Sequence, residues 1–488
     1  MSLSAADREF FRALGDVVFG NPFSAERGEL IVRLAPGAKP GDLTIDREAL
    51  ARVVAPKLAP YLREGAIALQ RLGAEDRRLL EPALLYVGYH RCVPHLDALI
   101  EQQARHSGAP LPVPFADEVI ADLVRGGLAR EQAPRYFALY YQLRRAFYFI
   151  HRSLAGDCES MRRFREALWN NVFTHDMRGF DTALWDRMED FSTLLLGETG
   201  TGKGQAAAAI GRSAFIPYLP QERRFAANFK ETFIAINLSQ FPESLIESEL
   251  FGHRKGAFSG AIDHHQGVFE RCDPHGALFL DEIGEVEIPV QIKLLQVLQD
   301  RTFLPVGGRE TKRFSGRVIA ATNRSLGQLR RQGRFRDDFF YRLCSDVIEL
   351  PTLRQRIAES PKELEQLVHL LVARVVRREA PELAASVLES LDATLPRGYA
   401  WPGNVRELEQ AVRRILLTGR YAADLPRAGE AGEGLESLFA EGRLTADEML
   451  ARYCAMLYRQ LGSYTAVAER TGLDPRTSRK YILAAKSG

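Results

Sequence analysis

The sequence lacks the patterns of a secreted, disulfide-stapled or membrane-spanning protein. Its five cysteines are scattered and include no C-x-x-C pair, so neither a disulfide framework nor a zinc centre is indicated. The first residues, MSLSAADREFFRALGD, do not have the basic and then apolar order of a signal peptide, and no apolar run approaches the length of a membrane span. We therefore expect a cytoplasmic protein in a reducing compartment, with no membrane partner.

An excess of charge of either sign is also missing. Lys and Arg number 65 and Asp and Glu 63, which leaves a net charge of +2. Global charge therefore gives no argument for nucleic acid, and any DNA-binding surface must be local. The length of 488 residues has room for about three domains of ordinary soluble composition.

Residues 1–185 lack the clustered carboxylates and strand-helix alternation of a receiver domain. Apolar residues at spacings of three and four predict helices over residues 50–72, 75–89, 116–128 and 132–154. A strand-like piece at 30–34 interrupts this pattern. The aromatic-rich stretch 136–150 is either a core helix or the wall of a ligand pocket, and a core helix is the more frequent outcome. We expect a mostly helical regulatory domain over 1–185, whose ligand the sequence does not identify.

From residue 191 the pattern changes to short apolar strands that alternate with helices. The predicted strands cover residues 194–196, 233–236, 277–280, 318–321 and 347–350. This alternation predicts an α/β fold with a doubly wound parallel sheet, in which ligands bind at the carboxyl ends of the strands.

The first of these strands runs into a glycine-rich loop with the pattern G-x-x-x-x-G-K. Such a loop turns its N–H groups around a polyphosphate, the next helix adds the positive end of its dipole, and Lys203 neutralises phosphate oxygens. Gly204 stands where a Ser or Thr commonly holds Mg²⁺. The alternative is a glycine-rich turn with no ligand. The expected nucleotide-binding residues are Gly197, Glu198, Thr199, Gly200, Thr201, Gly202, Lys203 and Gly204.

Polar side chains follow three further strands. Asp281 and Glu282 come directly after strand 277–280, where a nucleotide hydrolase needs one carboxylate for Mg²⁺ and one for the attacking water. An acidic pair that caps the next helix is the alternative. Asn323 ends the next strand, and Asn237 is expected to reach the Glu282 carboxylate. We predict a site for ATP and Mg²⁺, with Asp281 as the metal ligand.

A loop between these strands carries a single phenylalanine among small residues. Glycines on both sides favour a flexible hairpin tip, and an exposed Phe258 there favours a protein partner. The loop consists of Gly256, Ala257, Phe258, Ser259, Gly260 and Ala261.

This loop resembles the GAFTGA loop of bacterial enhancer-binding proteins, the AAA+ ATPases that activate sigma-54 RNA polymerase, and residues 191–417 resemble their central domain. The resemblance implies that the loop contacts the sigma factor. It also implies that Arg336 and Arg342 are arginine fingers for the neighbouring subunit's nucleotide, so that hydrolysis needs a ring, expected to be a hexamer. Arg406 is similar to the family's second sensor, which points from a helical lid to the nucleotide. Two surface arginines on a helix are the alternative for the finger pair.

The chain departs from the family pattern at several positions. Gly204 replaces a glutamate, and Ser259 replaces a threonine while keeping the hydroxyl. The segment of residues 215–230 is longer than the family norm. None of these changes falls on the predicted catalytic groups.

After a linker at residues 421–442, two short helices joined through Gly472 predict a helix-turn-helix in residues 443–488. It resembles the Fis-type domain of the same family, although three-helix fragments with glycine turns are also common without DNA. The residues expected to face DNA are Arg476, Thr477, Ser478, Arg479 and Lys480.

The predicted architecture is therefore a helical regulatory domain, an AAA+ α/β subdomain (186–355), a helical lid (356–420), the linker and a DNA-binding domain. The resemblance implies an ATP-hydrolysing activator that binds an upstream DNA element and remodels the promoter complex of sigma-54 RNA polymerase. Two alternatives remain open. One is a nucleotide-binding repressor or co-regulator that does not hydrolyse ATP, and the other is an AAA+ remodeller of another protein.

Overall fold

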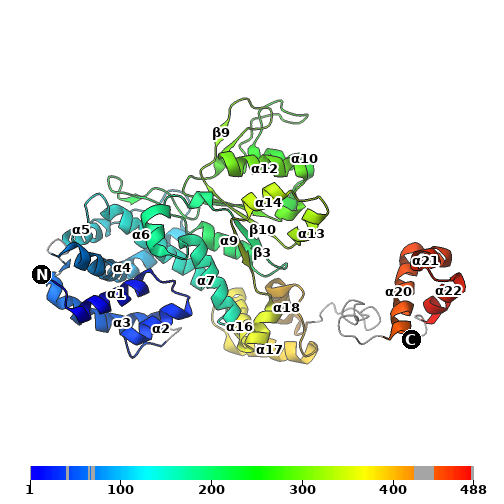
Figure 1. Cartoon of the computed structure of the whole chain (residues 1–488), viewed down its shortest axis with the longest axis horizontal. Helices are drawn as coiled ribbons and strands as arrows, with labels where there is room; N and C mark the ends of the chain where they lie inside the picture. Colours follow the sequence, from blue (N-terminus) through cyan, green and yellow to red (C-terminus); the bar gives the residue numbers. More distant parts are fainter. Residues whose placement is uncertain (1, 40–42, 64–65, 68–71, 422–444, 485–488) are drawn as a thin grey trace. The chain divides into compact units, whose positions relative to one another are not determined.

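The computed structural model describes residues 2–39, 43–63, 66–67, 72–421 and 445–484 (Figure 1). The chain divides into two compact units, Met1–Arg420 and Tyr421–Gly488, each of which is described by itself. The predicted linker at 421–442 lies outside the described residues except for Tyr421.

The N-terminal part of the first unit is helical, as predicted, but two details of the prediction were wrong. The strand-like piece at 30–34 lies in helix α2, which begins after Ser24, whose hydroxyl accepts a hydrogen bond from the Arg27 N–H. The predicted helix 50–72 ends at Leu58, where Pro60 disfavours a further helical turn. The elements of this part are α1 (Ala5–Phe19), α2 (Ala25–Leu34), α3 (Leu43–Leu58), η1 (Ala59–Tyr61), β1 (Leu62–Arg63), β2 (Ala66–Ile67), α4 (Ala74–Arg105), α5 (Ala116–Gly126), α6 (Ala133–Arg152), α7 (Glu159–Phe173), α8 (Met177–Gly179), η3 (Phe180–Leu184) and η4 (Met188–Asp190).

A five-stranded parallel sheet forms the centre of the first unit and confirms the predicted strands to within a residue or two. Its order is β11-β3-β10-β7-β6. The strands are β3 (Thr193–Leu196), β6 (Phe233–Asn237), β7 (Ala277–Asp281), β10 (Arg317–Thr322) and β11 (Asp346–Glu349). The other elements of this α/β part are α9 (Lys203–Gly211), β4 (Tyr218–Leu219), β5 (Arg224–Phe225), η5 (Leu238–Gln240), α10 (Glu243–Phe251), α11 (Val268–Arg271), η6 (Ile283–Glu285), α12 (Ile288–Asp300), β8 (Thr302–Phe303), β9 (Lys312–Arg313), α13 (Leu326–Arg331) and α14 (Asp337–Leu343).

The strands are apolar on both faces because each face has its own hydrophobic core. Leu195, Phe279 and Ile319 belong to a core that continues through α9 into the N-terminal helices. Their neighbours Leu194 and Leu278 belong to a second core with α10, α12 and α14. This alternation explains why the sequence shows continuous apolar runs instead of alternating polar residues.

Helix α6 joins the N-terminal helices to the α/β part. The buried Arg145 side chain donates to the carbonyl oxygens of Arg212 (2.5 Å) and Ala214 (2.7 Å), just past the C-terminal end of α9. The ring of Tyr141 stacks on Phe225 of the β4–β5 hairpin at 3.9 Å. The long segment 215–230 therefore serves, at this hairpin, to cover the aromatic face of α6.

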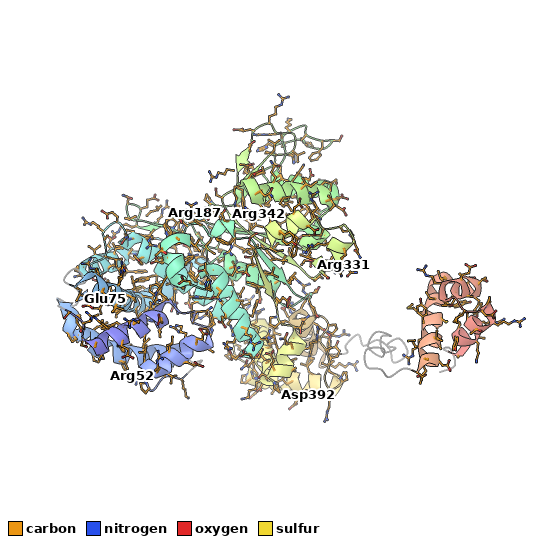
Figure 2. The ribbon with its side chains drawn as sticks, in the orientation of Figure 1. Arg52, Glu75, Arg187, Arg331, Arg342 and Asp392 are labelled. Carbon is orange, nitrogen blue, oxygen red and sulfur yellow. The ribbon has the colours of Figure 1, made fainter. Side chains whose placement is uncertain are left out.

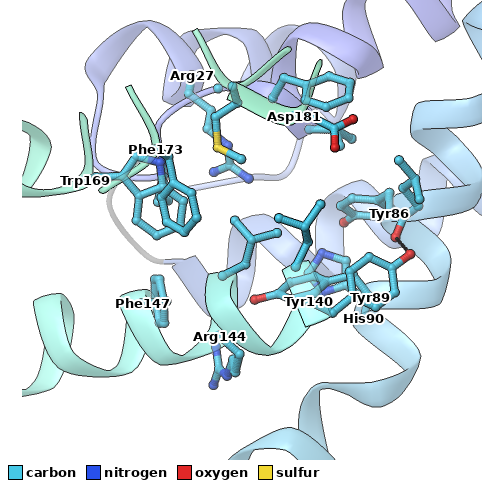
Figure 3. Close-up of a pocket in the computed structure, with 18 of the residues that line it drawn as sticks. Arg27, Tyr86, Tyr89, His90, Tyr140, Arg144, Phe147, Trp169, Phe173 and Asp181 are labelled. Carbon is cyan, nitrogen blue, oxygen red and sulfur yellow. Dashed lines mark hydrogen bonds between the residues drawn. The ribbon is translucent and has the colours of Figure 1, made fainter. Parts of the chain in front are cut away.

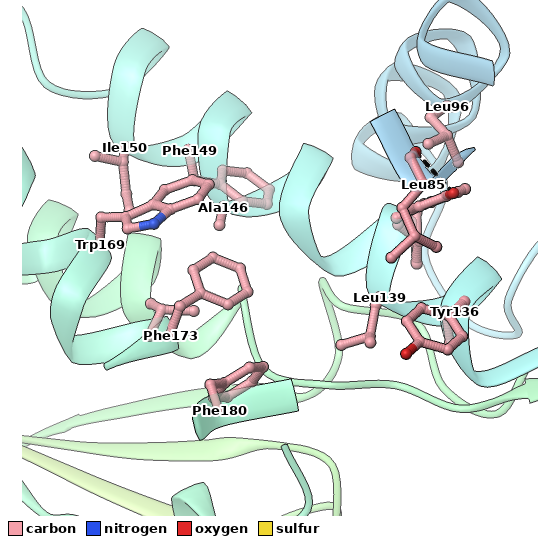
Figure 4. Close-up of a cluster of buried hydrophobic side chains, with 14 of the residues drawn as sticks. Leu85, Leu96, Tyr136, Leu139, Ala146, Phe149, Ile150, Trp169, Phe173 and Phe180 are labelled. Carbon is pink, nitrogen blue, oxygen red and sulfur yellow. Dashed lines mark hydrogen bonds between the residues drawn. The ribbon is translucent and has the colours of Figure 1, made fainter. Parts of the chain in front are cut away.

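Helix α7 makes a second connection, at a buried polar cluster beside the sheet. The Asn171 amide donates to Thr193 Oγ1 (2.9 Å) and to Asp346 Oδ2 (2.6 Å), and the Arg317 guanidinium donates to the Asn171 Oδ1 oxygen (3.0 Å). Burial lowers the pKa of Arg317 to about 10, with Asp346 acting in the opposite direction. Trp169 and Phe173 of α7 meet Ala146 and Ile150 of α6 and Phe180 in a cluster of buried side chains (Figure 4).

Four helices after the sheet form the lid. They are α15 (Leu353–Glu359), α16 (Lys362–Val376), α17 (Pro381–Thr394) and α18 (Asn404–Thr418). Arg356 and Glu363 form a buried ion pair (2.7 Å) in the lid, and Glu363 Oε1 also accepts hydrogen bonds from the N–H groups of Asp157 (2.5 Å) and Cys158 (2.8 Å). The lid is thereby attached to the start of α7.

The second unit contains three helices in its described part: α20 (Ala446–Leu461), α21 (Tyr464–Thr471) and α22 (Pro475–Ala484). Thr445 and Glu448 form a capping box at the start of α20, and Gly462 and Gly472 end α20 and α21 in the left-handed conformation that favours glycine. Val467 and Ile482 lie in its small core.

Candidate functional site

The glycine-rich loop lies between β3 and α9, as the sequence predicts. Gly200 (φ 81°) and Gly202 (φ 103°) take up backbone conformations that other residues rarely adopt, and Gly202 precedes the first residue of α9. The N-terminus of α9 therefore opens into the loop, an arrangement that favours anions.

Lys203, Asp281 and Glu282 line one cavity of 760 Å³ together with the loop. The Lys203 ammonium donates to the carbonyl oxygens of Gly197 (2.8 Å) and Glu198 (3.2 Å). Burial lowers the pKa of Lys203, and the nearby carboxylates of Glu282 and Asp281 act in the opposite direction. The Lys203 ammonium and these two carboxylates thus share the cavity with several arginines, and its volume is within the range of about 300–1,000 Å³ that suits a small-molecule ligand.

Glu282 is held in an unusual environment. Its backbone has a φ of 56°, and its N–H donates to Asp281 Oδ1 at 3.0 Å. Burial, followed by the charge of Asp281, raises the pKa of Glu282 above the ordinary glutamate value. Its buried Oε2 atom has no hydrogen-bond partner among the described residues. Such an orphaned acceptor fits a group that hydrogen-bonds a water molecule in the cavity.

The two predicted asparagines lie at the same edge of the sheet but make different contacts. Asn237 is paired in register with Asp281 on the neighbouring strand. Its Oδ1 atom accepts hydrogen bonds from the Ser239 N–H (3.0 Å) and hydroxyl (2.8 Å), and in the described part of the chain it has no hydrogen bond with Glu282. The predicted contact of Asn237 with Glu282 is therefore absent. Asn323 donates to Thr199 Oγ1 (3.0 Å) and so contacts the phosphate loop directly.

The lid closes over the loop through contacts that the sequence did not predict. The fully buried Asn404 donates from Nδ2 to Glu198 Oε2 and to the Thr199 carbonyl, both at 3.1 Å, and the Val405 N–H donates to the Gly200 carbonyl at 3.1 Å. Arg354 forms an ion pair with Glu198 at 2.5 Å. The signal available in the sequence was Pro402-Gly403 before Asn404, which indicates a tight turn but not its target.

Arg406 and Gly204 both line the 760 Å³ cavity. Gly204 is exposed, and a Cβ atom there would come no closer than 3.9 Å to Phe279. No cluster of three metal-binding side chains occurs in the described ranges. Mg²⁺ binds oxygen ligands and shares them with substrate phosphates, so Asp281 together with nucleotide oxygens is a suitable donor set.

The two predicted arginine fingers lie away from this cavity within the chain. Arg336 pairs with Asp338 at 2.6 Å, and the Arg342 Nε–H donates to the Leu298 carbonyl at 2.9 Å. Neither is among the described residues that line the cavity. Arg342 lies far from Asp392 of the lid helix α17 (Figure 2). Within the chain, these two arginines therefore contact Asp338 and Leu298 and not the cavity.

The phenylalanine loop forms a tight hairpin tip. The Gly256 N–H donates to the Ala261 carbonyl at 2.8 Å, and Phe258 is 37% exposed. The Phe258 ring rests edge-on against His253 at 4.9 Å. A Cβ atom on Gly307 would meet Ala257 at 2.8 Å, so a second loop packs against the first. This supporting loop was not predicted from the sequence.

Helix α22 presents the predicted basic residues, with one correction. Arg476, Arg479 and Lys480 are exposed, and Thr477 is half-buried. Ser478 is fully buried among the three helices, so its side chain cannot face DNA and the prediction for this residue was wrong.

The central part of the chain is similar to known proteins. Residues 181–349 match the family described as the Sigma-54 interaction domain. The chain is 43% identical over 226 residues to the Nif-specific regulatory protein of Azotobacter vinelandii, covering 46% of this chain and 40% of that protein. It is 36% identical over 298 residues to the transcriptional regulatory protein ZraR of Klebsiella oxytoca, covering 59% and 62%. It is 41% identical over 254 residues to the DNA-binding transcriptional regulator NtrC of Escherichia coli (strain K12), covering 51% and 49%.

The matched part of the chain therefore spans between 40% and 62% of the length of these relatives. Within the described residues, no helix combines the length and the apolar character needed to cross a lipid bilayer.

Proposed function

We propose that this chain, whose central part is a sigma-54 interaction domain, is an ATP-hydrolysing activator of sigma-54 RNA polymerase that binds an upstream DNA element. The observation that carries the proposal is the convergence of Lys203, Asp281, Glu282 and Arg406 on one cavity behind the phosphate loop. These four groups come from three separate segments, and their charges are those that a metal-bound triphosphate needs.

Each group has a distinct role in this proposal. The N–H groups of the loop and the Lys203 ammonium hold the β- and γ-phosphates. Asp281 would hold Mg²⁺, and a bound Mg²⁺ would supply positive charge to neutralise the phosphates. Glu282 accepts a hydrogen bond from the attacking water on its free oxygen and takes up a proton as the water attacks. Asn323 contacts the γ-phosphate, and its hydrogen bond to Thr199 couples the presence or loss of that phosphate to the conformation of the phosphate loop.

Hydrolysis in this scheme requires a ring of subunits. Arg336 and Arg342 do not line the chain's own cavity, and both belong to the α14 segment, Arg336 as its N-cap residue. A neighbouring subunit that places this segment against the cavity would complete the site with two cations. Such a head-to-tail contact closes into a ring, for which we propose six subunits.

The phenylalanine loop is the part that acts on the sigma factor in this proposal. Its glycines permit movement, and the partly exposed Phe258 ring offers an apolar contact. The resemblance of this loop to GAFTGA supports the assignment. A Phe258→Ala variant should keep ATP turnover and lose promoter opening.

The test of the central proposal is ATP turnover by the Glu282→Gln variant. We expect turnover to fall by about 10²–10⁴-fold while ATP binding is retained, because only the proton acceptor is lost. Glu285→Gln is the matched control, since Glu285 pairs with Arg324 (2.6 Å) outside the cavity. Unchanged turnover in Glu282→Gln would contradict the proposed role and favour a non-hydrolysing regulator.

A further inference from the structure

A second cavity lies in the helical N-terminal part, separate from the nucleotide cavity (Figure 3). Its volume is 240 Å³. An apolar cavity of about 150 Å³ binds benzene, which has one ring. The larger cavity in this protein therefore has room for a molecule of about two rings. Residues of α4, α6 and α7 form most of its wall: Tyr86, Tyr89, Tyr140, Leu143, Trp169 and Phe173.

The aromatic stripe on α6 therefore has two functions. One face of the helix packs on the β4–β5 hairpin, while Tyr140 and Leu143 face the cavity. The Tyr140 hydroxyl donates to the Leu85 carbonyl at 2.8 Å, which fixes the ring at the wall. Flat, rigid walls of this kind suit a planar ligand.

The charged side chains beside the cavity already have partners within the protein. Arg144 forms an ion pair with Asp97 at 2.5 Å, and Asp181 accepts hydrogen bonds from Arg135 (2.7 Å) and from the Tyr136 hydroxyl (3.0 Å). The Arg27 Nε–H donates to the Val17 carbonyl at 2.9 Å. A charged ligand would lose its hydration without gaining a new counter-charge from the first two pairs, which favours an uncharged ligand.

Trp169, one of the residues that line the cavity, carries a polar group, the indole N–H, which is a hydrogen-bond donor. Its side chain is only 5% exposed, and its Nε1 atom has no hydrogen-bond partner in the described ranges of the chain. An indole N–H can only donate, and a buried donor without a partner is costly. A ligand with a hydrogen-bond acceptor would satisfy it.

From these observations we propose that the cavity binds an uncharged, planar, two-ring aromatic molecule whose carbonyl or ring nitrogen accepts a hydrogen bond from Trp169. The ligand fills the space between α4, α6 and α7, and Trp169 selects for the acceptor.

Helix α7 connects this site to the nucleotide cavity. The residues just before α7, Asp157 and Cys158, donate to Glu363 of the lid, and Asn171 near its end bonds to Thr193 of β3, the strand that leads into the phosphate loop. Trp169 lies between these two ends. A ligand that shifts α7 therefore changes both the lid and the strand. This step rests on the proposed nucleotide binding, whereas binding in the cavity does not.

The binding test uses calorimetry on the full chain with coumarin and naphthalene. The two probes have the same two-ring size, but only coumarin carries a carbonyl acceptor. We expect coumarin to bind about tenfold more tightly, since one buried donor is satisfied. No binding of either probe would overturn the site. Tighter binding of 2-naphthoate than of coumarin would overturn the uncharged assignment and indicate that Arg27 selects an anion.

Two variants locate the bound probe. Trp169→Phe should weaken coumarin by about tenfold and leave naphthalene almost unchanged. Trp185→Phe is the matched control, because Trp185 lies outside the cavity wall and should affect neither probe. Leu143→Trp should fill the cavity and abolish binding of both. Equal weakening of both probes by Trp169→Phe, or binding that survives Leu143→Trp, would contradict the proposal.

The coupling is tested with ADP, so that hydrolysis is not required. If coumarin changes ADP affinity by a given factor, ADP must change coumarin affinity by the same factor. We expect a factor of at least about five in both titrations. Independent binding of the two ligands would overturn the role of α7 and leave the aromatic site intact. Failure of ADP to bind at all would instead contradict the proposed function.

Discussion

Asn404, the first residue of lid helix α18, donates one amide hydrogen to Glu198 Oε2 and the other to the Thr199 carbonyl, both at 3.1 Å. Its Oδ1 atom accepts a hydrogen bond from the Leu353 N–H at 2.8 Å. One buried side chain thus fixes the phosphate loop to both ends of the lid. The position of the lid and the shape of the loop are therefore coupled.

The Asn404→Asp variant tests this coupling. The carboxylate keeps the size of the amide but loses both donors and places a negative charge beside Glu198. Leaving such buried groups unsatisfied costs about 1–3 kcal/mol, so we expect ATP affinity to fall by about tenfold or more. Calorimetric titration of the native chain and the variant with a slowly hydrolysed ATP analogue measures this change in affinity.

Arg354→Gln provides the comparison for Asn404→Asp. Arg354 contacts the same Glu198 carboxylate, but both side chains of this ion pair are exposed at the surface. Exposed pairs contribute about 0–1 kcal/mol, so the loss of ATP affinity should be small. An equal loss in the two variants would mean that the charge on Glu198, and not the buried amide, holds the loop.

Two glycines of the phosphate loop should respond in opposite ways to alanine. A Cβ atom on Gly200 would lie 2.1 Å from the Gly403 carbonyl oxygen, and its φ of 81° is also unfavourable for alanine. Gly204 lies inside α9, and its nearest neighbour would be 3.9 Å away. We expect Gly200→Ala to abolish nucleotide binding. Gly204→Ala should keep it and raise the free energy of unfolding by about 0.5 kcal/mol. Thermal unfolding with and without ADP distinguishes the two results.

A second substitution at Gly204 tests why this chain has a glycine where the enhancer-binding family that it resembles has a glutamate. Because this position is exposed and has free space, a Gly204→Glu variant should fold normally. Misfolding of Gly204→Glu would show that neighbouring groups require a glycine there.

The environment of Glu282 predicts the acid limb of the pH profile of ATP turnover. Burial and the charge of Asp281 raise its pKa, so the carboxylate needed to accept a proton forms only at a pH above the ordinary glutamate range. The pH dependence of kcat/KM reports the ionisations of the free enzyme, so kcat/KM should rise with pH through this raised pKa. In Glu282→Gln the residual rate should not show this limb. A limb at the ordinary glutamate pKa in the native chain would contradict the burial argument.

The sequence predicted those parts of the fold that depend on local pattern. Apolar runs identified all five strands, and carboxylates at strand ends identified Asp281 and Glu282, because parallel strands meet at one edge. Contacts between distant segments were not predictable. The amide of Asn404 reaches Glu198 across about two hundred residues, and nothing near either residue indicates the other.

The errors have equally specific causes. The helical spacing of α22 placed Ser478 beside Arg479, but a short helix in a three-helix unit must bury one face, and Ser478 lies on that face. The piece at 30–34 has four branched apolar residues and one arginine, a composition that suits a strand. The Ser24 cap upstream instead favours a helix from Ala25 onward.

The buried ion pair of Arg356 and Glu363 should be important for stability. Arg356→Leu would leave Glu363 as a buried charge that retains only backbone donors, from Asp157 and Cys158. Breaking a buried pair on one side costs about 3–5 kcal/mol, so the first unit should unfold at much lower denaturant concentration. The control is Glu359→Gln, which alters an exposed contact to the Ser160 N–H (2.7 Å) in the same region. Similar midpoints for Arg356→Leu and the native chain would show that the pair contributes little.

Helix α22 allows a matched test of DNA binding. Arg479 is exposed and its guanidinium lies 5.7 Å from the centre of the Tyr464 ring, whereas the neighbouring Ser478 is buried. If Arg479 contacts a phosphate, Arg479→Ala should weaken binding on all sequences alike and reduce the slope of log K against log salt by about 1. If it contacts a base, the loss should be confined to the preferred site, with a penalty of about 1–3 kcal/mol. Ser478→Ala should leave DNA affinity unchanged, because its side chain does not reach the surface. Unchanged binding to duplex DNA in Arg476→Ala, Arg479→Ala and Lys480→Ala together would contradict a DNA-binding role for this helix.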